Sequence, residues 1–359
     1  MPSDVTPSYQ LSFVCYPFHP TKSSGRGVDR YCWELLEHYR AEPNGVQLDV
    51  VQQDTSVGTW ASGKKLVSLT ADLLRAKSKV FHAVSPPAGA AAILSGKRNV
   101  VVTIHDLLPF QVKSYSPSFK LAYARWCTDV CVAKAAAIIV PFSVTRDELV
   151  AVHGANPDRI HIVNYGVDHA TYYPRPELPR KPGRVLYVGE MSRAKGVDVL
   201  LNAFAQVKRR VPNAELWLGG KGKDKQLLED MARSLGLEDV SFKGFIPEDE
   251  LPALYASATV MVFPSRYGFG LSSLEAMACG TPAIVTRTLD AIEFMEGAGI
   301  MVQPESIDDL ATNIERTLTD PTHHADLSQK GIARASRYAW NLTAAQTLEV
   351  CTKIASLAP

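Results

Sequence analysis

The sequence predicts an α/β protein with two doubly wound, Rossmann-like domains, each built on a parallel sheet. Short runs of β-branched and other apolar residues alternate with helical segments along the whole chain, which is typical of such sheets. A stretch rich in proline and charge, residues 173–183, interrupts this alternation, and the same pattern starts again beyond it. The chain of 359 residues also exceeds one ordinary core and suits two domains of about 170 residues each.

The first domain is expected to span residues 1–172. Six short apolar runs predict its strands, because strands buried on both faces of a parallel sheet are continuously apolar. The runs are Leu11–Tyr16, Leu48–Val51, Val80–His82, Val100–Ile104, Ala137–Val140 and His161–Val163. Helices are expected between them, notably at Val28–Arg40, Phe119–Lys134 and Thr145–Val152.

The second domain, residues 184–335, is expected to repeat this arrangement, with a helix or turn after each strand. Its predicted strands are Val185–Val188, Glu215–Leu218, Val240–Phe242, Val260–Phe263, Ala283–Val285 and Ile300–Val302. The prolines of residues 173–183 exclude regular structure, so this stretch is the predicted linker. The final residues, 336–359, are expected to contain a helix over Tyr338–Leu357.

Composition predicts a cytoplasmic protein with reduced thiols. No apolar run reaches the roughly 18 residues that a membrane span needs, and Met1 to Gln10 lacks a basic region followed by an apolar one. The six cysteines form no CxxC pair and most have apolar neighbours, so we expect core residues. Cys127 and Cys131 are one helical turn apart, but without suitably spaced histidines they predict no metal site.

The net charge of +1 excludes the strongly basic footprint of a nucleic-acid-binding protein. Basic residues are in slight excess in the first half of the chain and acidic residues in the second. This bias fits an anionic or membrane-associated acceptor at the N-terminal half, and it fits a chance distribution equally well.

The segment Phe263–Pro282 places a buried strand, a glycine turn and a helix start in succession. Free backbone N–H groups at such a helix start favour an anion, so we expect a phosphate near Gly270, Leu271 and Ser272, with Ser272 as the N-cap. Glu275, in the first turn, can accept hydrogen bonds from the vicinal hydroxyls of a ribose. The alternative is an ordinary strand, turn and helix in which this carboxylate complements the helix dipole.

The same segment resembles the retaining nucleotide-sugar glycosyltransferases of family four, which have the GT-B fold. Their signature places Glu, seven residues and Glu within P-S-x-x-E-G-F-G-L-P-x-L-E-A-M-A-C-G-T-P. Eight positions before Glu275 stands Tyr267, so the first Glu is replaced, or deleted after Tyr267, and Ser272 stands where the family has Pro. In the family the first Glu contacts the donor sugar and the second contacts the ribose, so the resemblance implies ribose binding by Glu275 and carries no sugar contact over to Tyr267. We expect the donor to be bound by Tyr267, Phe269, Gly270, Leu271 and Ser272.

A second motif, Gly189–Gly196, follows the strand Val185–Val188. Lys195 lies just before a helix and is suited to neutralising a diphosphate, and Arg193 can add a bidentate contact; a solvated loop is the alternative. The segment resembles the family's V-G-R-x-x-x-x-K-G phosphate loop. Lys195 matches the family's Lys, and Arg193 is offset from the usual Arg. Both are our candidates for stabilising the leaving diphosphate.

Two strand ends further along predict a nucleoside site. Gly220, in the turn after Glu215–Leu218, permits a close approach of the nucleoside, although an ordinary turn accounts for it equally well. The later segment Phe242–Ile246 resembles the family's base-binding strand end. The resemblance implies main-chain contacts to the base at Phe245 and Ile246, and such contacts do not reveal which base.

The first half supplies three further candidates. His105 follows the strand Val100–Ile104, where the family's T-I-H-D-L motif implies a place near the donor sugar; a structural turn capped by Asp106 is the alternative. Gly25 and Gly27 lie in a loop that resembles the family's G-G-I-G-R-Y. The resemblance implies that their amides approach the diphosphate, and gating of the acceptor is an alternative role.

Taken together, the resemblance implies two domains facing across a cleft, with the last segment, 336–359, crossing back to the first domain. It implies transfer of a hexosyl or N-acetylhexosaminyl group, with retention, from a nucleotide diphosphate sugar to a hydroxyl of a glycan, lipid-linked or small-molecule acceptor. The N-terminal half is expected on the acceptor side, with or without peripheral contact at the inner face of the membrane. No Asp-x-Asp motif precedes the candidate residues, so we expect positive side chains in place of a metal ion and no cofactor.

Three alternatives remain at this point. A nucleotide-sugar epimerase of the same fold needs additional acid and base groups and no acceptor. A dinucleotide-dependent oxidoreductase is disfavoured, because Gly25 and Gly27 form only a partial match to G-x-G-x-x-G. The absence of the first Glu also fits a non-catalytic subunit that binds nucleotide sugars. The nucleotide, the sugar, the acceptor and the oligomeric state cannot be inferred from the residues.

Overall fold

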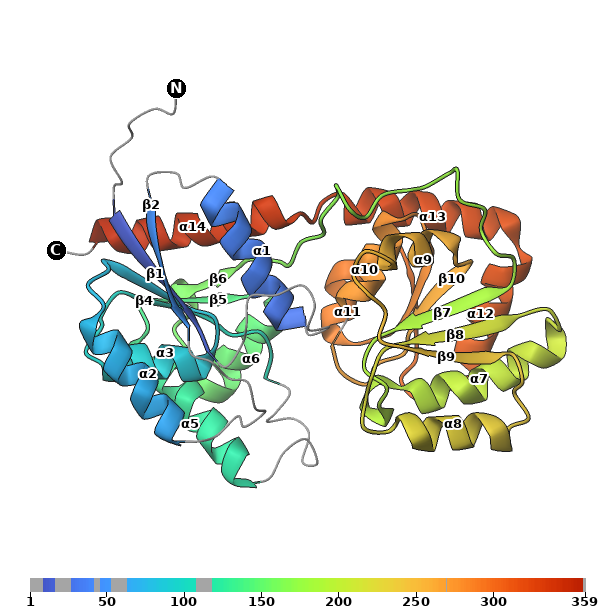
Figure 1. Ribbon diagram of the computed structural model, residues 1–359, viewed down its shortest axis with the longest axis horizontal. Helices are drawn as coiled ribbons and strands as arrows, with labels where there is room; N and C mark the ends of the chain where they lie inside the picture. Colours follow the sequence, from blue (N-terminus) through green and yellow to red (C-terminus); the bar gives the residue numbers. More distant parts are fainter. Residues whose placement is uncertain are drawn as a thin grey trace. The chain divides into compact units, whose positions relative to one another are not determined.

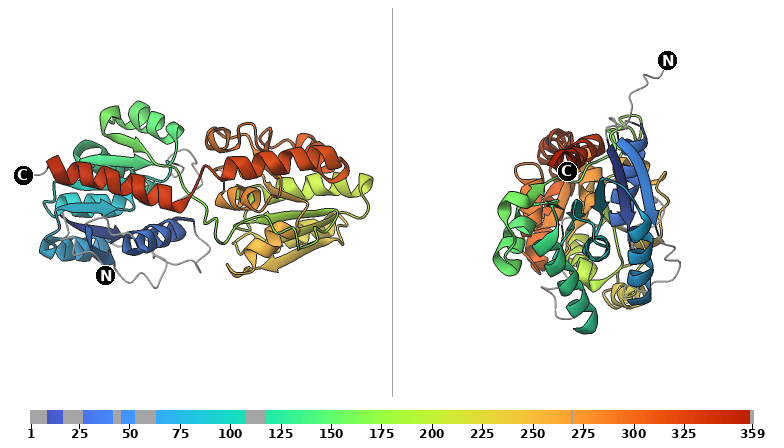
Figure 2. Two further views of the ribbon diagram at one scale, coloured as in Figure 1. Left: turned by 90° about the horizontal axis from the view of Figure 1, so that it is seen from above. Right: turned by 90° about the vertical axis from the view of Figure 1, so that its left-hand side faces the viewer.

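The protein consists of two compact units that share one continuous chain (Figure 1). The structure is a computed structural model that describes residues 9–16, 27–41, 46–52, 63–107, 118–268 and 270–357. Unit 1 contains the chain up to Gly166 together with the segment from Trp340 onward, and unit 2 contains Val167–Ala339. Each unit is a parallel α/β sheet with helices on both of its faces (Figure 2).

Unit 1 has a six-stranded parallel sheet in the order β2-β1-β3-β4-β5-β6. The strands are β1 (Tyr9–Cys15), β2 (Val46–Gln52), β3 (Val80–Ala83), β4 (Val100–Thr103), β5 (Ala137–Val140) and β6 (Ile160–Ile162). The helices are α1 (Gly27–Ala41), α2 (Gly63–Arg75), α3 (Pro86–Leu94), α5 (Ser118–Lys134), α6 (Ser143–His153), the 3₁₀ turn η1 (Pro157–Arg159) and α14 (Trp340–Leu357). Every residue of β3, β4 and β5 is buried, because helices cover both faces of the sheet.

Unit 2 has a six-stranded parallel sheet in the order β12-β11-β10-β7-β8-β9. The strands are β7 (Arg184–Val188), β8 (Glu215–Gly219), β9 (Val240–Gly244), β10 (Val260–Phe263), β11 (Ala283–Thr286) and β12 (Ile300–Val302). The helices are η2 (Arg193–Lys195), α7 (Val197–Arg210), α8 (Lys225–Ser234), α9 (Leu251–Ser257), α10 (Leu271–Ala278), α11 (Leu289–Met295), α12 (Ile307–Thr319) and α13 (Pro321–Ala335). The strand order reverses between β7 and β10, the usual place for a ligand in a doubly wound sheet.

The predicted strands are confirmed in both units, with ends that differ by at most two residues. Helices α2 and α3 were not predicted. Helix α3 is rich in alanine and buried over most of its length, so it lacks the polar face that makes a helix visible in a sequence. Its start is fixed by Ser85, whose hydroxyl accepts a hydrogen bond from the backbone N–H of Ala88.

The chain crosses between the units after Gly166 and again after Ala339. Residues 173–183 therefore belong to unit 2, although the sequence predicts a linker there. Arg180 explains the difference, since its guanidinium donates to the carbonyls of Ala258 and Gly280 and to the hydroxyl of Thr281. The prolines exclude regular structure in this segment, and the arginine still anchors it to the unit.

The predicted cysteine environment agrees with the structure, in which all six thiols are free and buried. Within the described ranges, no three His, Cys, Asp or Glu side chains gather as a metal-binding group. No helix in this part of the chain is both long enough and apolar enough to cross a bilayer.

Candidate functional site

Two loops meet at the carboxyl ends of β7 and β10, the strands that flank the reversal of strand order in unit 2. These strands pair in parallel, with Val185 opposite Val260 and Leu186 opposite Met261. The loop after β7 contains η2, and we call residues 193–196 the β7 loop. The loop after β10 leads into α10, and we call residues 264–268 the β10 loop.

Glycine makes the close approach of the two loops possible. Gly196 has a φ of +70°, and a Cβ added there would lie 1.9 Å from the carbonyl oxygen of Pro264 in the β10 loop. Gly270 has a φ of +72°, and its added Cβ would lie 2.6 Å from the ring of Phe263. A larger residue at Gly196 would push the two loops apart, and one at Gly270 would displace the Phe263 ring at the end of β10.

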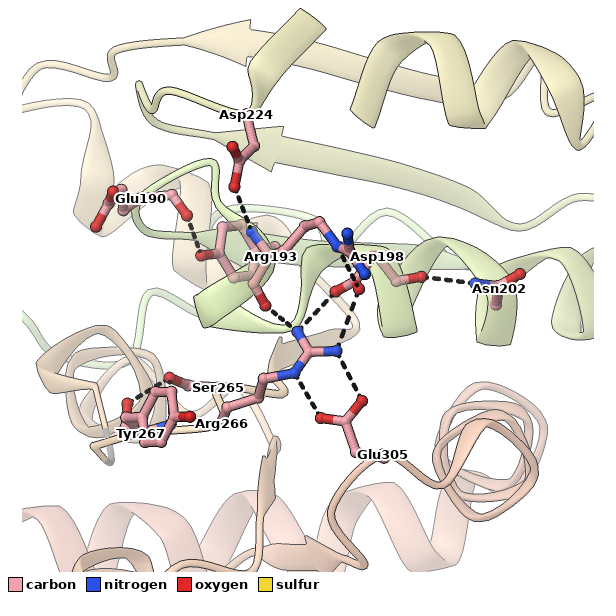
Figure 3. Close-up of polar contacts among 10 residues, drawn as sticks. Glu190, Arg193, Asp198, Asn202, Asp224, Ser265, Arg266, Tyr267 and Glu305 are labelled. Carbon is pink, nitrogen blue, oxygen red and sulfur yellow. Dashed lines mark hydrogen bonds and ion pairs between the residues drawn. The ribbon is translucent and has the colours of Figure 1, made fainter. Parts of the chain in front are cut away.

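Backbone and side-chain hydrogen bonds join the loops directly, and Figure 3 draws the one from the Arg266 guanidinium to the Arg193 carbonyl. The backbone N–H of Arg266 donates to the carbonyl of Ala194 at 3.2 Å, and the Arg266 guanidinium donates to the carbonyl of Arg193. The Lys195 ammonium donates to the carbonyl of Tyr267 at 3.4 Å. The structure therefore brings two predicted site residues, Lys195 and Tyr267, into contact.

Arg193 lies in the same place, but its side chain is directed elsewhere. Its Nε lies 3.3 Å from an Asp198 carboxylate oxygen in the first turn of α7, and 65% of the side chain is exposed. Its backbone N–H donates to Asp224 at 2.9 Å, which fixes the main chain of the β7 loop. The Arg193 side chain is therefore an exposed cation paired with Asp198, and the residue meets the β10 loop through its main-chain carbonyl.

Glycines also bring the ends of β7, β8 and β9 together. The N–H of Gly220 donates to the carbonyl of Gly244 at 2.6 Å, and an added Cβ at Gly220 would lie 1.8 Å from the carbonyl oxygen of Gly189. Ile246 packs on the glycine face of Gly219. Phe245 stays 39% exposed, with the Lys221 ammonium 5.0 Å from its ring centre. The predicted nucleoside residues Gly220, Phe245 and Ile246 are thus neighbours at one edge of the sheet.

The start of α10 differs from the sequence prediction. Gly270 is the N-cap and the helix begins at Leu271, so the prediction of Ser272 as N-cap is wrong. The positive φ of Gly270 turns the chain directly into the helix, which leaves Ser272 inside its first turn. Leu271 and Ser272 are in the first turn of α10, where no carbonyl of a preceding helical turn can accept from their N–H groups. The predicted anion site at this helix start therefore stays a prediction.

Glu275 is buried and lies beyond the first turn of α10, so the prediction that placed it in the first turn is wrong, because the helix begins at Leu271. The residue is 5% exposed, and its Oε2 accepts a hydrogen bond from the Tyr255 hydroxyl of α9 at 3.0 Å. This contact fixes one face of the carboxylate. Its contact with a ribose stays a prediction.

His105 lies in unit 1 after β4, with hydrogen bonds at both ring nitrogens. Nε2 lies 3.0 Å from the carbonyl oxygen of Val84, which can only accept, so this nitrogen carries the proton. Nδ1 then accepts from the Tyr165 hydroxyl at 2.8 Å. Burial lowers the pKa of His105 to about 4, against a smaller opposing effect of the Val84 carbonyl. The imidazole is therefore neutral at physiological pH.

The remaining predicted residues are placed as follows. Gly27 is the first residue of α1 in unit 1 and is exposed. Gly25 and Phe269 lie outside the described residues. The structure thus groups Lys195, Arg193, Tyr267 and the residues around Gly270 in unit 2, whereas His105 and Gly27 belong to unit 1.

Sequence reasoning missed three residues that hold the two loops. Arg266 lies inside the recognised segment, but its position there gave no sign of a partner. Asp198 carried only the general signal of an acidic residue in the first turn of a helix. Glu305, 39 positions after Arg266, had no local signal at all.

Two family models match the chain. The model described as Glycosyltransferase Family 4 matches residues 25–171, and the model described as Glycosyl transferases group 1 matches residues 170–334. The chain belongs to the group 1 glycosyltransferases. The segments that carry the resemblance in the sequence fall within these two ranges.

Curated relatives of this group 1 glycosyltransferase differ in the acceptors that their names state. O-antigen chain mannosyltransferase B of Escherichia coli is 27% identical over 262 residues, which cover 69% of this chain and 68% of the relative. D-inositol 3-phosphate glycosyltransferase of Pseudarthrobacter chlorophenolicus is 35% identical over 231 residues, covering 60% and 55%. Mannosylfructose-phosphate synthase of Agrobacterium fabrum is 31% identical over 234 residues, covering 59% and 51%. The chain spans about half the length of the last two.

Solved structures establish the fold of this glycosyltransferase as GT-B. Sucrose-phosphate synthase from Thermosynechococcus elongatus superimposes with a TM-score of 0.82 at 23% identity, covering 97% of this chain and 99% of that one. HepE from Anabaena, in complex with UDP and glucose, gives a TM-score of 0.78 at 20% identity, covering 96% and 100%.

Proposed function

We propose that this glycosyltransferase binds a nucleotide diphosphate sugar in unit 2 and transfers the sugar, with retention, to a hydroxyl acceptor. The observation that carries the proposal is the contact of the Lys195 ammonium with the Tyr267 carbonyl, beside the start of α10. A cation, a glycine turn and the first N–H groups of a helix thus lie together where the strand order of the sheet reverses. The HepE complexes with UDP and UDP-glucose support this class of donor.

In the proposed reaction, the acceptor oxygen bonds to the anomeric carbon as the bond from that carbon to the diphosphate breaks, and the proton of the acceptor hydroxyl passes to the departing diphosphate oxygen. Negative charge then develops on the departing diphosphate. Lys195 and the first N–H groups of α10 stabilise that charge, which lowers the barrier. Arg193 is held only by a partly exposed ion pair, so its turning from Asp198 towards the diphosphate costs little free energy.

The rest of the donor fits along the same edge of unit 2. We propose that the Glu275 carboxylate, oriented by Tyr255, accepts from the ribose hydroxyls. The main chain at Phe245 and Ile246, together with the glycine face at Gly220, would hold the base. The mannosyltransferase among the relatives supports a hexosyl group as the transferred sugar.

On the side of unit 1, we propose that His105 contacts the sugar as a neutral imidazole. Its proton is held on Nε2 by the Val84 carbonyl, so at neutral pH it does not supply a proton. Nδ1 would accept a hydrogen bond from a sugar hydroxyl in exchange for the Tyr165 hydroxyl. The amides of Gly25 and Gly27 are proposed to approach the diphosphate. We propose a glycan, lipid-linked or small-molecule hydroxyl as the acceptor.

We further propose that the transfer needs no metal ion, because Lys195 and the helix start supply positive charge where a metal-dependent enzyme holds a cation. Assays with EDTA and with added Mg²⁺ or Mn²⁺ test this directly. Equal rates are expected in all three. A rate that EDTA abolishes and Mg²⁺ restores contradicts the proposal.

The donor site is tested by thermal unfolding with millimolar UDP, GDP, ADP and TDP and their common sugars, in EDTA. A nucleotide at about 100 times its Kd adds roughly 2.7 kcal/mol to stability. The shift should disappear in Lys195→Ala and Glu275→Ala, and persist in Lys225→Ala, which removes only a surface pair with Glu229. NMR of the product then assigns the anomeric configuration.

Three outcomes contradict the proposal in different ways. Stabilisation by none of the nucleotides means that the altered signature forms no donor site. Binding without turnover across glycan, lipid and small-molecule acceptors points to the non-catalytic binding subunit, which the tyrosine at position 267 favours. A product with inverted configuration at the anomeric carbon would leave the proposed transfer activity intact and contradict the proposed retaining mechanism.

A further inference from the structure

Arg266 is held by two carboxylates at once (Figure 3). Its two terminal nitrogens donate to the two carboxylate oxygens of Asp198, at 2.9 and 3.1 Å. Its Nη2 and Nε also lie 2.7 and 2.6 Å from the two carboxylate oxygens of Glu305. One edge of the guanidinium thus contacts the Asp198 carboxylate and another edge contacts the Glu305 carboxylate. The planar group of arginine can make both bidentate contacts, whereas the ammonium of lysine cannot.

The backbone at Glu305 is an independent observation that the surrounding structure holds this arrangement in place. Glu305 has a φ of 60°, and it is the one non-glycine residue with a positive φ among those that the structure describes. A side chain with a Cβ is unfavourable in this region, and such conformations persist where the surrounding structure requires them. Here the conformation places the carboxylate on Arg266, between β12 and α12.

Arg266 consequently joins three segments that are distant in sequence. Asp198 belongs to the first turn of α7, Glu305 to the loop before α12, and Arg266 itself to the β10 loop. The same guanidinium reaches the carbonyl of Arg193, and the next residue, Tyr267, accepts from Lys195. The charge of Arg266 is balanced by two carboxylates, so it is not available to a phosphate.

We infer that Arg266 is a positioning residue for the donor: clamped by Asp198 and Glu305, it sets the spacing between the β7 and β10 loops and so places Lys195 beside the start of α10. This inference rests on the proposed function of unit 2. It assigns the effect of Arg266 to donor binding, without contact between Arg266 and the donor.

The test compares Arg266→Met with Arg210→Met. The control removes an arginine of the same unit that pairs with Glu315 at 2.7 Å on the surface of α7 and α12. Calorimetric titration with UDP, GDP and ADP gives the Kd, and donor kinetics give KM and kcat. Because the loops lose their fixed spacing, Arg266→Met should weaken binding of the preferred diphosphate about tenfold and raise donor KM in proportion, whereas Arg210→Met should match wild type.

A second variant separates positioning from stability. Glu305→Gly removes one carboxylate and also relieves the positive φ, so the protein should unfold at the same or a higher temperature than wild type. Positioning predicts that its Kd and donor KM still rise, by about threefold or more. Arg266→Lys should recover only part of the affinity, because an ammonium cannot engage both carboxylates along two edges.

The outcomes that contradict the inference are distinct from failure of the proposed function. If wild type binds a diphosphate and Glu305→Gly and Arg266→Met stay within about twofold of it in Kd and KM, Arg266 does not position the donor. If Arg266→Met does not fold, Glu305→Gly alone decides between these results. If wild type binds none of the three diphosphates, the proposed function fails, and this inference fails with it.

Discussion

Tyr267 stands eight positions before Glu275, where the family signature has its first Glu, and the Tyr267 backbone is held by hydrogen bonds at both its N–H and its carbonyl. The Ser265 hydroxyl accepts from the Tyr267 N–H at 3.2 Å and also donates to the Tyr267 carbonyl, which meets Lys195 as well. The main chain of the β10 loop is therefore held by groups that do not depend on the missing carboxylate. If Tyr267 replaces the first Glu of the signature, a phenol stands where the family has the carboxylate that contacts the sugar.

If the phenol hydrogen-bonds the donor sugar, Tyr267→Phe should lower kcat/KM for the sugar donor about fivefold to tenfold, since a hydrogen bond to a neutral group contributes about 1 kcal/mol or slightly more. Binding of the nucleoside diphosphate without its sugar should not change. Steady-state kinetics with several sugar donors provide the measurement, and Tyr173→Phe, at an exposed tyrosine beside Arg175, is the control. Equal kinetics of Tyr267→Phe and wild type would refute this substitution of phenol for carboxylate.

Buried histidines in unit 1 make stability depend on pH. Burial lowers the pKa of His82 to about 3 and that of His105 to about 4, whereas both titrate near 6.5 when unfolded. Below pH 6.5 the unfolded chain binds protons that the folded chain does not. The two neutral histidines therefore contribute fully to the free energy of unfolding above pH 6.5. That contribution is lost as the pH falls towards 4, at up to about 1.4 kcal/mol per pH unit for each histidine.

Urea unfolding between pH 7 and pH 4 measures this dependence. We expect the midpoint to fall with decreasing pH in wild type and to fall less steeply in His105→Gln. Identical slopes for the two proteins would mean that His105 titrates with the same pKa in the folded and the unfolded state.

At the scale of elements, the strands were predictable and the contacts that join the loops were not. Parallel strands covered on both faces are short apolar runs, such as Ala137–Val140, and that pattern is visible in a single sequence. The start of α10 was misplaced, because the left-handed conformation of Gly270 is a backbone property that several residues of that turn could satisfy. The pairing of Arg266 with Glu305 depends on the fold of the whole unit, so no local sequence pattern predicts it.

The approach of the β7 loop to the β10 loop depends on Gly196. Gly196→Ala should destabilise the protein by about 2 to 4 kcal/mol, because it combines a positive φ with a Cβ that meets the Pro264 carbonyl. Gly236→Ala is a matched control, since Gly236 has a φ of +67° with nothing within 4 Å of the added Cβ, and it should cost only about 1 kcal/mol. Chemical denaturation measures both, and equal losses would show that the two loops can separate without cost.

At the scale of the whole molecule, each unit has its own sheet and core, and α14 completes the first. Trp340, at the start of α14, is 2% exposed and packs edge-on against Tyr31 of α1, with Tyr165 alongside. The segment that follows unit 2 therefore forms part of the core of unit 1. The sequence predicted this terminal helix, and the aromatic residues at its base could be recognised as partners only in three dimensions.

Because the proposed donor residues of the β7 and β10 loops all belong to unit 2, a fragment of residues 167–339 should bind the nucleoside diphosphate by itself, within about tenfold of the affinity of the whole protein. Titration of the purified fragment measures this, with Lys195→Ala in the fragment as the control. A folded fragment that binds nothing would place an essential part of the nucleotide site in unit 1.

The two points at which the chain enters and leaves unit 2 are neighbours. The Val167 N–H donates to the Tyr338 carbonyl at 3.2 Å, and Val167 forms an isolated parallel bridge with Ala339. In the gene, unit 2 is thus an insertion between the two parts of the sequence that encode unit 1, and the two ends of the inserted unit are neighbours in space. We expect that such an insert can be excised and its flanks rejoined by a short peptide, or its own ends linked and reopened elsewhere. Exchange of unit 2 between relatives should then need no redesign of the core of unit 1.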